Sequence, residues 1–157
     1  MRTELIEKLK GKLVFFDFDG TLSEFRFFDK VGPETVTGEL LYKFSFENVY
    51  DNVRPLSVMQ QTIANMNPEN VYILGAITIN HEIEEKYKWL VKYYPTIKKE
   101  NIIFVNSADS KLGILEAYSK KFNMKSEDIV FVDDMHYTIL KAEELGFTAY
   151  HPSSFID

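Results

Sequence analysis

The sequence contains no cysteine, so it can form neither disulfide bonds nor thiolate metal sites. It also lacks an apolar run of the roughly 18–20 residues needed to span a membrane. Its first ten residues mix charged and apolar positions, unlike a signal peptide. Positive charge is scarce, since 18 Lys and Arg face 24 Asp and Glu, which argues against a nucleic-acid polymer or an anionic membrane as partner. These absences together predict a cytoplasmic protein.

The composition is that of a folded chain. Apolar residues make up 45% and aromatic residues 15% of the 157 positions, which excludes disorder over most of the length. A chain of this size supports one hydrophobic core but not two independent ones. We therefore expect a single domain over residues 1–157.

Short apolar runs alternate with segments in which apolar residues have helical spacing. The runs are nearly continuous and rich in β-branched residues, as in parallel strands buried on both faces. They are Leu13–Phe16, Val71–Leu74, Ile102–Val105, Ile129–Val132 and Phe147–Tyr150. The alternation predicts right-handed βαβ units and an α/β fold, namely a three-layer, doubly wound parallel sheet of Rossmann-like type.

Four helices are expected between and after these runs. The first follows Pro55, Asn80 is expected to cap the second, and Asp109 or Ser110 the third. Gly146 stands where the residue after the fourth helix belongs. The apolar face predicted for the second helix consists of Ile83, Tyr87, Leu90, Val91 and Tyr94.

Residues 23–54 interrupt this alternation. They separate the first strand from its helix by far more than an ordinary βα loop, and they contain many aromatic residues. A long loop in a compact domain is usually functional, so we predict a small cap insertion over the site. Alternatively, or in addition, these rings pack together as a subsidiary core.

Two pairs of acidic residues follow predicted strands, at the edge where open α/β sheets bind ligands. Asp17 and Asp19 follow the first strand, and Asp133 and Asp134 follow the fourth. Converging carboxylates repel one another unless a cation or proton intervenes. Oxygen ligands without His or Cys suit a hard ion, so these four residues predict a Mg²⁺ site.

Three further residues suit a phosphate group. Gly20 allows a sharp turn in which the backbone N–H groups of the loop, including that of Thr21, face a phosphate. Lys111, near a helix N-terminus, adds positive charge. Together with a metal and two carboxylates, this pattern predicts phosphoryl transfer from a small phosphorylated substrate. A calcium EF-hand is excluded because Phe28 stands where that loop needs a bidentate Glu.

The segment Phe15-Phe16-Asp17-Phe18-Asp19-Gly20-Thr21-Leu22 closely resembles the first motif of the haloacid dehalogenase (HAD) superfamily. Lys111 resembles the third motif, and Ile129-Val130-Phe131-Val132-Asp133-Asp134 resembles the fourth in its double-aspartate form. The resemblance runs from about Lys12 to the end of the chain, except for the insertion, which stands at the family's first cap site.

The resemblance implies a Mg²⁺-dependent phosphatase. Asp17 would attack phosphorus, and Asp19 would protonate the leaving oxygen and then activate water. Asp17, the backbone carbonyl of Asp19, and Asp134 would hold the metal, with Asp133 supporting them. Lys111 would neutralise Asp17 and the phosphoryl oxygens. The family's dehalogenases lack the second aspartate, so its presence here implies a phosphatase.

The second motif departs from the family pattern. Its Ser or Thr normally follows the strand directly, but that place falls on Gly75, with Thr78 three residues later. Either Thr78 or the backbone amides after Gly75 would bind the phosphate; we favour Thr78 slightly.

A region from Lys86 to Leu90 and onward resembles 5′(3′)-deoxyribonucleotidase-like members of the superfamily. This resemblance, and aromatic residues able to stack on a nucleobase, favour a nucleotide-like substrate. Two alternatives remain open at this point. One is a non-catalytic module that binds a phosphorylated ligand on the same fold, and the other is a receiver-like domain that accepts a phosphoryl group.

Overall fold

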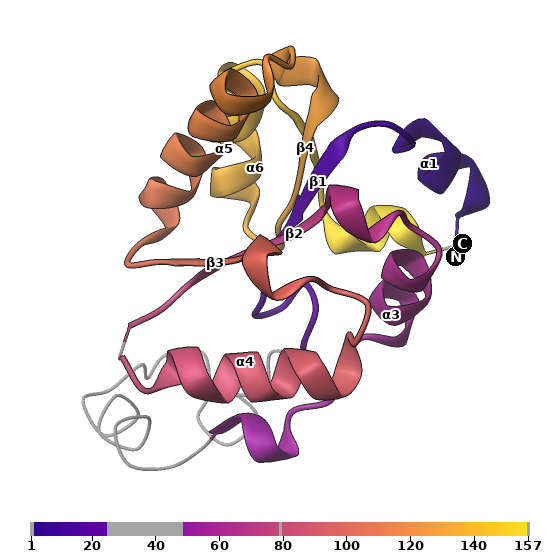
Figure 1. Cartoon of the computed structure of the whole chain (residues 1–157). Helices are drawn as coiled ribbons and strands as arrows, with labels where there is room; N and C mark the ends of the chain where they lie inside the picture. The colour runs from indigo at the N-terminus through magenta and orange to yellow at the C-terminus, as the bar shows by residue number, and fades with distance from the viewer. Residues whose placement is uncertain (1, 25–48, 79, 157) are drawn as a thin grey trace.

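The computed structural model describes residues 2–24, 49–78 and 80–156. Its core is a five-stranded sheet in the order β3-β2-β1-β4-β5, in which every pairing is parallel (Figure 1). The strands are β1 (Leu13–Phe16), β2 (Val71–Ala76), β3 (Ile102–Val105), β4 (Ile129–Val132) and β5 (Thr148–Tyr150). The predicted α/β fold with a doubly wound parallel sheet is confirmed.

Helices cover both faces of this sheet (Figure 1). The helices α5 (Ala108–Phe122) and α6 (His136–Glu144) pack on one face. The other face is covered by α1 (Thr3–Lys8), α3 (Ser57–Ala64) and α4 (Glu82–Tyr93). Short 3-10 turns complete the described chain: η2 (Val49–Asn52), η3 (Pro68–Asn70), η4 (Lys99–Asn101), η5 (Ser126–Asp128) and η6 (Pro152–Phe155).

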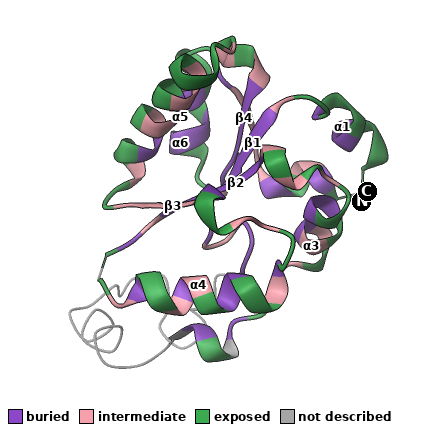
Figure 2. Ribbon diagram, in the orientation of Figure 1, coloured by how far each residue is buried: buried purple, intermediate pink, exposed green. Residues whose placement is uncertain are grey.

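The central strand β1 is enclosed on both faces (Figure 2). Its side chains alternate between two apolar clusters, because successive residues of a strand point to opposite faces. Val14 and Phe16 join the cluster beneath α3 and α4, whereas Leu13 and Phe15 join the one beneath α5. Because β1 is buried on both faces, it holds the start of the loop that follows its carboxyl end in a defined position.

The helix ends differ in part from the sequence-based expectations. Asn80 does not cap α4, which begins at Glu82 without any side-chain cap. Ser107 caps α5 by accepting a hydrogen bond from the Ser110 N–H at 3.2 Å, so neither Asp109 nor Ser110 is the cap. The predicted role of Gly146 after the fourth helix is confirmed by its φ of +85°. No described helix is long and apolar enough to cross a membrane.

The buried face of α4 also differs from the predicted one. Ile83 and Val91 are exposed to 41% and 55%, although both belong to the expected apolar stripe. The residues that α4 buries are Glu82, Lys86, Trp89 and Leu90. The helix is therefore rotated so that a charged pair faces inward.

The predicted cap lies largely outside the described residues, which omit positions 25–48. The two ends of the 23–54 segment are joined where they leave the domain. The Glu24 N–H donates to the carbonyl of Arg54 at 2.9 Å, and Ser23 bridges both Asp19 and Pro55. At the returning end, η2 packs against α4. That end therefore lies directly beside the loop that follows β1.

Candidate active site

The carboxyl ends of β1 and β4 are neighbours in the sheet, and they bring three acidic residues together. One carboxylate oxygen from each of Asp17, Asp133 and Asp134 lies within 4.8 Å of the others. The Asp17 N–H donates to the carbonyl of Val132 at 2.8 Å, which extends the strand pairing into the site. The parallel pairing of β1 with β4 thus brings Asp17 and Asp133, which are 116 positions apart in the chain, next to each other.

Lys111, in the first turn of α5, joins two of these carboxylates. Its ammonium donates to Asp17 Oδ1 at 2.5 Å and to Asp133 Oδ2 at 2.9 Å, and the residue is only 3% exposed. Asp133 is also held through its other oxygen, which accepts from the Met135 N–H at 2.8 Å. The sequence-predicted residues Asp17, Lys111, Asp133 and Asp134 therefore form one cluster.

Negative charge exceeds positive charge in this cluster. Burial raises the pKa of Asp17 above its ordinary value, although Lys111 offsets part of the effect. Burial and the neighbouring Asp133 raise the pKa of Asp134 to about 6. The pKa of Lys111 is raised overall. Burial lowers this pKa, but the negative charges of Asp17 and Asp133 raise it by more, so the ammonium stays charged.

A divalent cation fits this charge and these donors. Three carboxylates and one ammonium leave two negative charges without a partner inside the cluster. The side-chain ligand atoms that the cluster offers are carboxylate oxygens, which a hard ion such as Mg²⁺ prefers. The chemistry of the cluster thus agrees with the predicted magnesium site.

The loop after β1 wraps around one carbonyl. The backbone oxygen of Phe18 accepts from the N–H groups of Thr21, Leu22 and Ser23 at 2.8–3.3 Å. Gly20 adopts the left-handed conformation that this turn requires, with φ of +76°. Thr21 is completely buried, and its hydroxyl has no hydrogen-bond partner among the described residues. Thr21 therefore shapes the loop from inside, with its own N–H already engaged.

The Asp19 carboxylate stands apart from the other three. Its Oδ1 accepts from the Tyr50 hydroxyl at 2.9 Å, and its Oδ2 accepts from the Lys86 ammonium at 2.8 Å. Burial and the charge of Asp19 raise the pKa of Tyr50, so the hydroxyl keeps its proton and acts as the donor. The side chain of Asp19 remains 23% exposed, which leaves it accessible to a bound molecule.

Lys86 and Tyr50 are site residues that the sequence pattern did not identify. Lys86 lies on α4 three residues after Ile83 and four before Leu90, a spacing that places it near an apolar face. A lysine inside such a pattern normally indicates the edge of a solvated face. Tyr50 is one of the aromatic residues of the insertion, for which the sequence predicted a subsidiary core or a stacking surface.

The region of the second motif differs from the expected arrangement in where its strand ends. Gly75 does not follow the strand but lies within β2, where it pairs with Phe104. A Cβ placed on Gly75 would meet the Phe104 ring and Phe18 at 3.2 Å, so packing accounts for the glycine. Thr78 is exposed beyond the strand end, and its N–H donates to Glu82 Oε2 at 3.5 Å. Its binding of phosphate stays a prediction.

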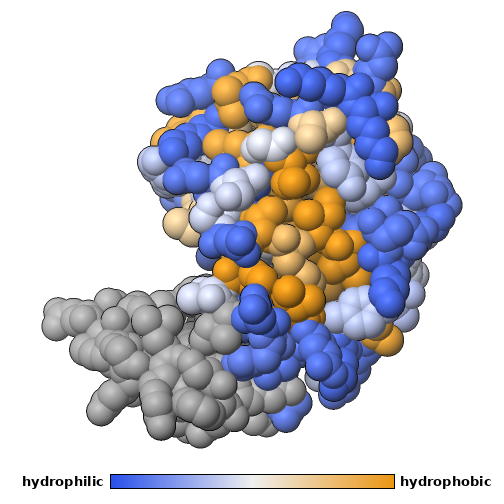
Figure 3. All heavy atoms as spheres, turned by 60° about the vertical axis from the view of Figure 1, so that its left-hand side comes forward, coloured by the Kyte–Doolittle hydropathy of each residue, from blue (hydrophilic) through white to orange (hydrophobic). Residues whose placement is uncertain are grey.

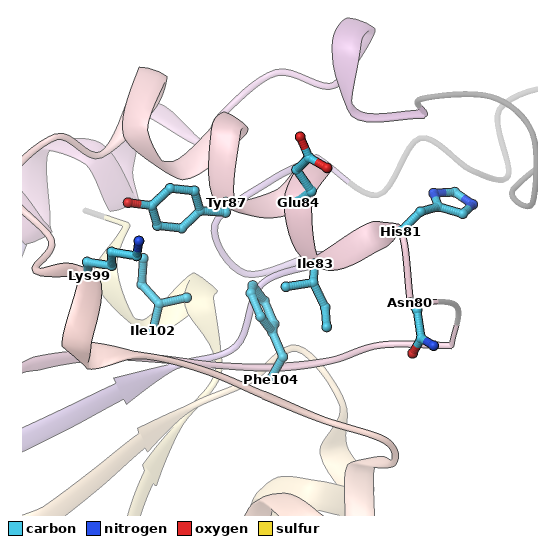
Figure 4. Close-up of a pocket in the computed structure, with 8 residues that line it drawn as sticks. All are labelled: Asn80, His81, Ile83, Glu84, Tyr87, Lys99, Ile102 and Phe104. Carbon is cyan, nitrogen blue, oxygen red and sulfur yellow. The ribbon is translucent and has the colours of Figure 1, made fainter.

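A separate pocket of about 510 Å³ lies between the start of α4 and the edge strand β3 (Figure 4). Apolar surface gathers on this side of the molecule (Figure 3). None of the clustered carboxylates lines the pocket. Its lining residues are Asn80, His81, Ile83, Glu84, Tyr87, Lys99, Ile102 and Phe104.

No family model and no curated protein sequence matches the chain. Among solved structures, it is similar to a HAD family enzyme of Bacteroides thetaiotaomicron in a magnesium complex, at 17% identity and a TM-score of 0.55. That match covers 90% of this chain and 92% of the other.

Two further solved structures show the same similarity. A haloacid dehalogenase-like hydrolase of Xanthomonas campestris matches at 12% identity and a TM-score of 0.57, over 88% of this chain and 81% of the other. A D,D-heptose 1,7-bisphosphate phosphatase of Burkholderia thailandensis matches at 14% identity and a TM-score of 0.51, over 87% and 74%. The chain therefore shares the fold of HAD-type hydrolases, as its motifs predict.

Proposed function

We propose that this protein is a Mg²⁺-dependent phosphatase of the HAD type that hydrolyses a small phosphate monoester through an aspartyl-phosphate. One observation carries the proposal. Asp17, at the end of the central strand, shares the buried Lys111 with Asp133, and all lie beside Asp134. Solved HAD enzymes with this fold, including a complex with magnesium and inorganic phosphate, support it.

The metal would be held by the carboxylates of Asp17 and Asp134 and by the backbone carbonyl of Asp19. Asp133 would act through Lys111 and through the Met135 N–H that it already accepts. When bound, Mg²⁺ supplies positive charge beside the oxygens of the transferring phosphoryl group. This accounts for a cluster that concentrates negative charge in a buried place.

The first chemical step belongs to Asp17 and Asp19. An oxygen of the Asp17 carboxylate attacks phosphorus while the bond to the leaving-group oxygen breaks. Asp19, protonated at this stage, gives its proton to that oxygen. Lys111 keeps the attacking carboxylate in place, and its charge compensates the phosphoryl oxygens.

The second step regenerates the enzyme. Asp19, now a carboxylate, takes a proton from a water molecule as the water oxygen attacks phosphorus. The bond between Asp17 and phosphorus breaks, which releases inorganic phosphate. The backbone turn at Gly20 and Thr21 holds the loop that carries both carboxylates, and Thr78 is the proposed side-chain contact to the phosphate.

A nucleotide-like substrate is the finer proposal. Tyr87 and Phe104 line the pocket beside α4 and offer aromatic surface on which a base can stack (Figure 4). The insertion at 23–54, as a small cap, would add further aromatic residues. A sugar phosphate is the competing class, since one solved neighbour is a heptose bisphosphate phosphatase.

One observation favours a second candidate function, a non-catalytic module that binds phosphorylated ligands. Gly75 lies inside β2 and Thr78 is exposed, so the usual hydroxyl directly after this strand is missing. Such a module would bind a phosphorylated ligand without releasing phosphate.

The deciding experiment measures phosphate release from p-nitrophenyl phosphate, then from panels of nucleoside monophosphates and sugar phosphates, with Mg²⁺ present. We expect turnover by the native protein and none by Asp17→Asn. Trapping of labelled phosphate on native protein but not on Asp17→Asn would identify the intermediate. Binding of phosphate esters without any turnover would instead establish the binding module.

A further inference from the structure

The Asp19 carboxylate is held at both oxygens by donors from two different parts of the chain. Tyr50, at the returning end of the insertion, donates to Oδ1, and Lys86, on α4, donates to Oδ2. Asp19 does not belong to the group formed by Asp17, Asp133 and Asp134. The two donors therefore hold this carboxylate in a place separate from that group.

Lys86 is itself fixed. It is 1% exposed, and its ammonium also donates to the carbonyl of Ala76 at 2.7 Å, at the end of β2. Glu82 Oε2 lies 3.6 Å from the same nitrogen, and the Phe18 ring centroid lies 5.1 Å away. An ammonium with this many neighbours has one position, so it fixes the direction in which Asp19 points.

Tyr50 is fixed by packing. It is 3% exposed, and its ring meets Phe18 edge-on, with centroids 5.4 Å apart and planes at 89°. Phe18 stands between Asp17 and Asp19 in the chain, so the same ring contacts the loop that carries both carboxylates. The position of the Tyr50 hydroxyl is thus coupled to the nucleophile loop.

We propose that Lys86 and Tyr50 are positioning residues that hold Asp19 ready for proton transfer to and from the substrate. The inference rests on the proposed function, because it assigns these residues to the acid–base step of that reaction. Each Asp19 oxygen has a second acceptor site that neither donor fills. The exposed part of the carboxylate is where the leaving-group oxygen, and later the water, would approach.

The proton balance leaves both partners unchanged. Asp19 gives one proton to the leaving-group oxygen as its bond to phosphorus breaks, and it regains one from the attacking water. Lys86 and Tyr50 keep their own protons throughout and only donate hydrogen bonds. Their loss therefore weakens acid–base help without removing the nucleophile Asp17.

The test compares phosphate esters whose leaving groups range from acidic phenols to weakly acidic alkyl alcohols. A good leaving group such as p-nitrophenol departs with little protonation, whereas an alkyl alcohol needs a positioned acid. We expect Lys86→Met to reduce kcat for alkyl phosphates by roughly 10- to 100-fold. This is smaller than the roughly 10²–10⁴-fold that acid–base catalysis typically contributes, because Asp19 itself remains. For p-nitrophenyl phosphate the expected loss is only a few-fold, with KM little changed for either ester.

Chemical rescue separates the ammonium from the bulk of the side chain. Because the native chain has no cysteine, Lys86→Cys carries a single thiol. Alkylation of the unfolded variant with 2-bromoethylamine, followed by refolding, restores an ammonium at the length of lysine, and 1-bromopropane gives an uncharged chain of the same length. Lys88→Cys, at a largely exposed position on the same helix, undergoes the same treatments as a control.

Recovery of alkyl phosphate hydrolysis with the ammonium but not with the propyl chain is the expected result. Tyr50→Phe, which removes only the hydroxyl, should show the same dependence on the leaving group, with smaller losses in kcat. This variant tests the inference even if the Lys86 variants do not fold. Equal losses across all esters, or no loss, would overturn the inference. If the native protein hydrolyses no ester, the proposed function fails first.

Discussion

Gly20 packs so closely against Asp134 that a Cβ placed on Gly20 would lie 2.2 Å from Asp134 Oδ2. The loop after β1 thus touches the acidic residue that follows β4 with no space for a side chain. The absence of a side chain at Gly20 serves two purposes, since the residue also has φ of +76°. This contact sets how close the Asp134 carboxylate lies to the loop that carries Asp17.

The first prediction concerns Gly20→Ala. The new methyl group must displace Asp134, and the backbone must accept a strained conformation that costs about 1–3 kcal/mol. We expect weaker Mg²⁺ binding and a large loss of turnover in a protein that still folds. Titration of activity with Mg²⁺ measures the first effect.

The matched control is Gly113→Ala on α5, where a Cβ would meet nothing within 4 Å. Helix propensity favours alanine there by roughly 0.5–1 kcal/mol, so this variant should be at least as stable as the native protein. An active Gly20→Ala with native Mg²⁺ dependence would show that Asp134 does not bind the metal.

The second prediction is that Asp17→Asn abolishes turnover and yet stabilises the metal-free protein. An amide is a poor nucleophile, and it removes one of the negative charges that the buried cluster holds in excess. Urea denaturation in the presence of a chelator measures the free energy of unfolding of both proteins. Lower stability of Asp17→Asn would mean that Lys111 already balances the cluster.

The third prediction concerns pH. The folded state raises the pKa of Asp17 and brings that of Asp134 to about 6, so it binds more protons than the unfolded chain in the mildly acidic range. These two groups therefore make the metal-free protein less stable as pH rises from about 4 to about 7. Thermal melts with a chelator across this range measure the slope, which Asp17→Asn should flatten.

Mg²⁺ should reverse this trend, because a metal that binds carboxylates competes with protons. The stabilisation by Mg²⁺ is expected to be larger at about pH 8 than at about pH 5. A stabilisation by Mg²⁺ that does not change with pH would mean that the ion binds outside this cluster.

The fourth prediction separates the two adjacent acids. Asp133 is fully buried and holds both Lys111 and the Met135 N–H, whereas Asp134 makes no such contacts to Lys111. We expect Asp133→Ala to lower the free energy of unfolding, with a loss of about 3–5 kcal/mol for breaking a buried charge pair. Asp134→Ala should leave the fold intact and raise the Mg²⁺ concentration needed for activity. If Asp133→Ala instead raised the Mg²⁺ requirement, and Asp134→Ala destabilised the fold, Asp133 would be the metal ligand.

The strands were predictable because burial on both faces leaves a direct signal in composition. Three of the five strands have the predicted bounds, β2 continues to Ala76, and β5 begins at Thr148. The cluster at their ends was also predictable, since parallel strands place Asp17 and Asp133 at one edge. In both cases the pattern and the structure depend on the same sheet geometry.

The inward face of α4 was not predictable from periodicity. Lys86 and Glu82 are charged, so the pattern assigns them to solvent, but the pairing of Lys86 with Asp19 compensates the loss of water. That pairing joins residues 67 positions apart and exists only once the chain has folded. The packing role of Gly75 was not predictable for a similar reason, because its neighbour Phe104 belongs to another strand.

The central place of β1 has a consequence for how the molecule opens. Amide protons of the edge strands β3 and β5 can exchange with solvent through local fraying, but those of β1 are bonded between β2 and β4. The Asp17 amide, which donates to the carbonyl of Val132, is expected to exchange as slowly as the amides of β1. Asp17 is therefore expected to lose its position only when the whole sheet unfolds. If Asp17 is the nucleophile, as proposed, a destabilising substitution far from the site should lower the fraction of folded molecules and leave the turnover of each folded one unchanged.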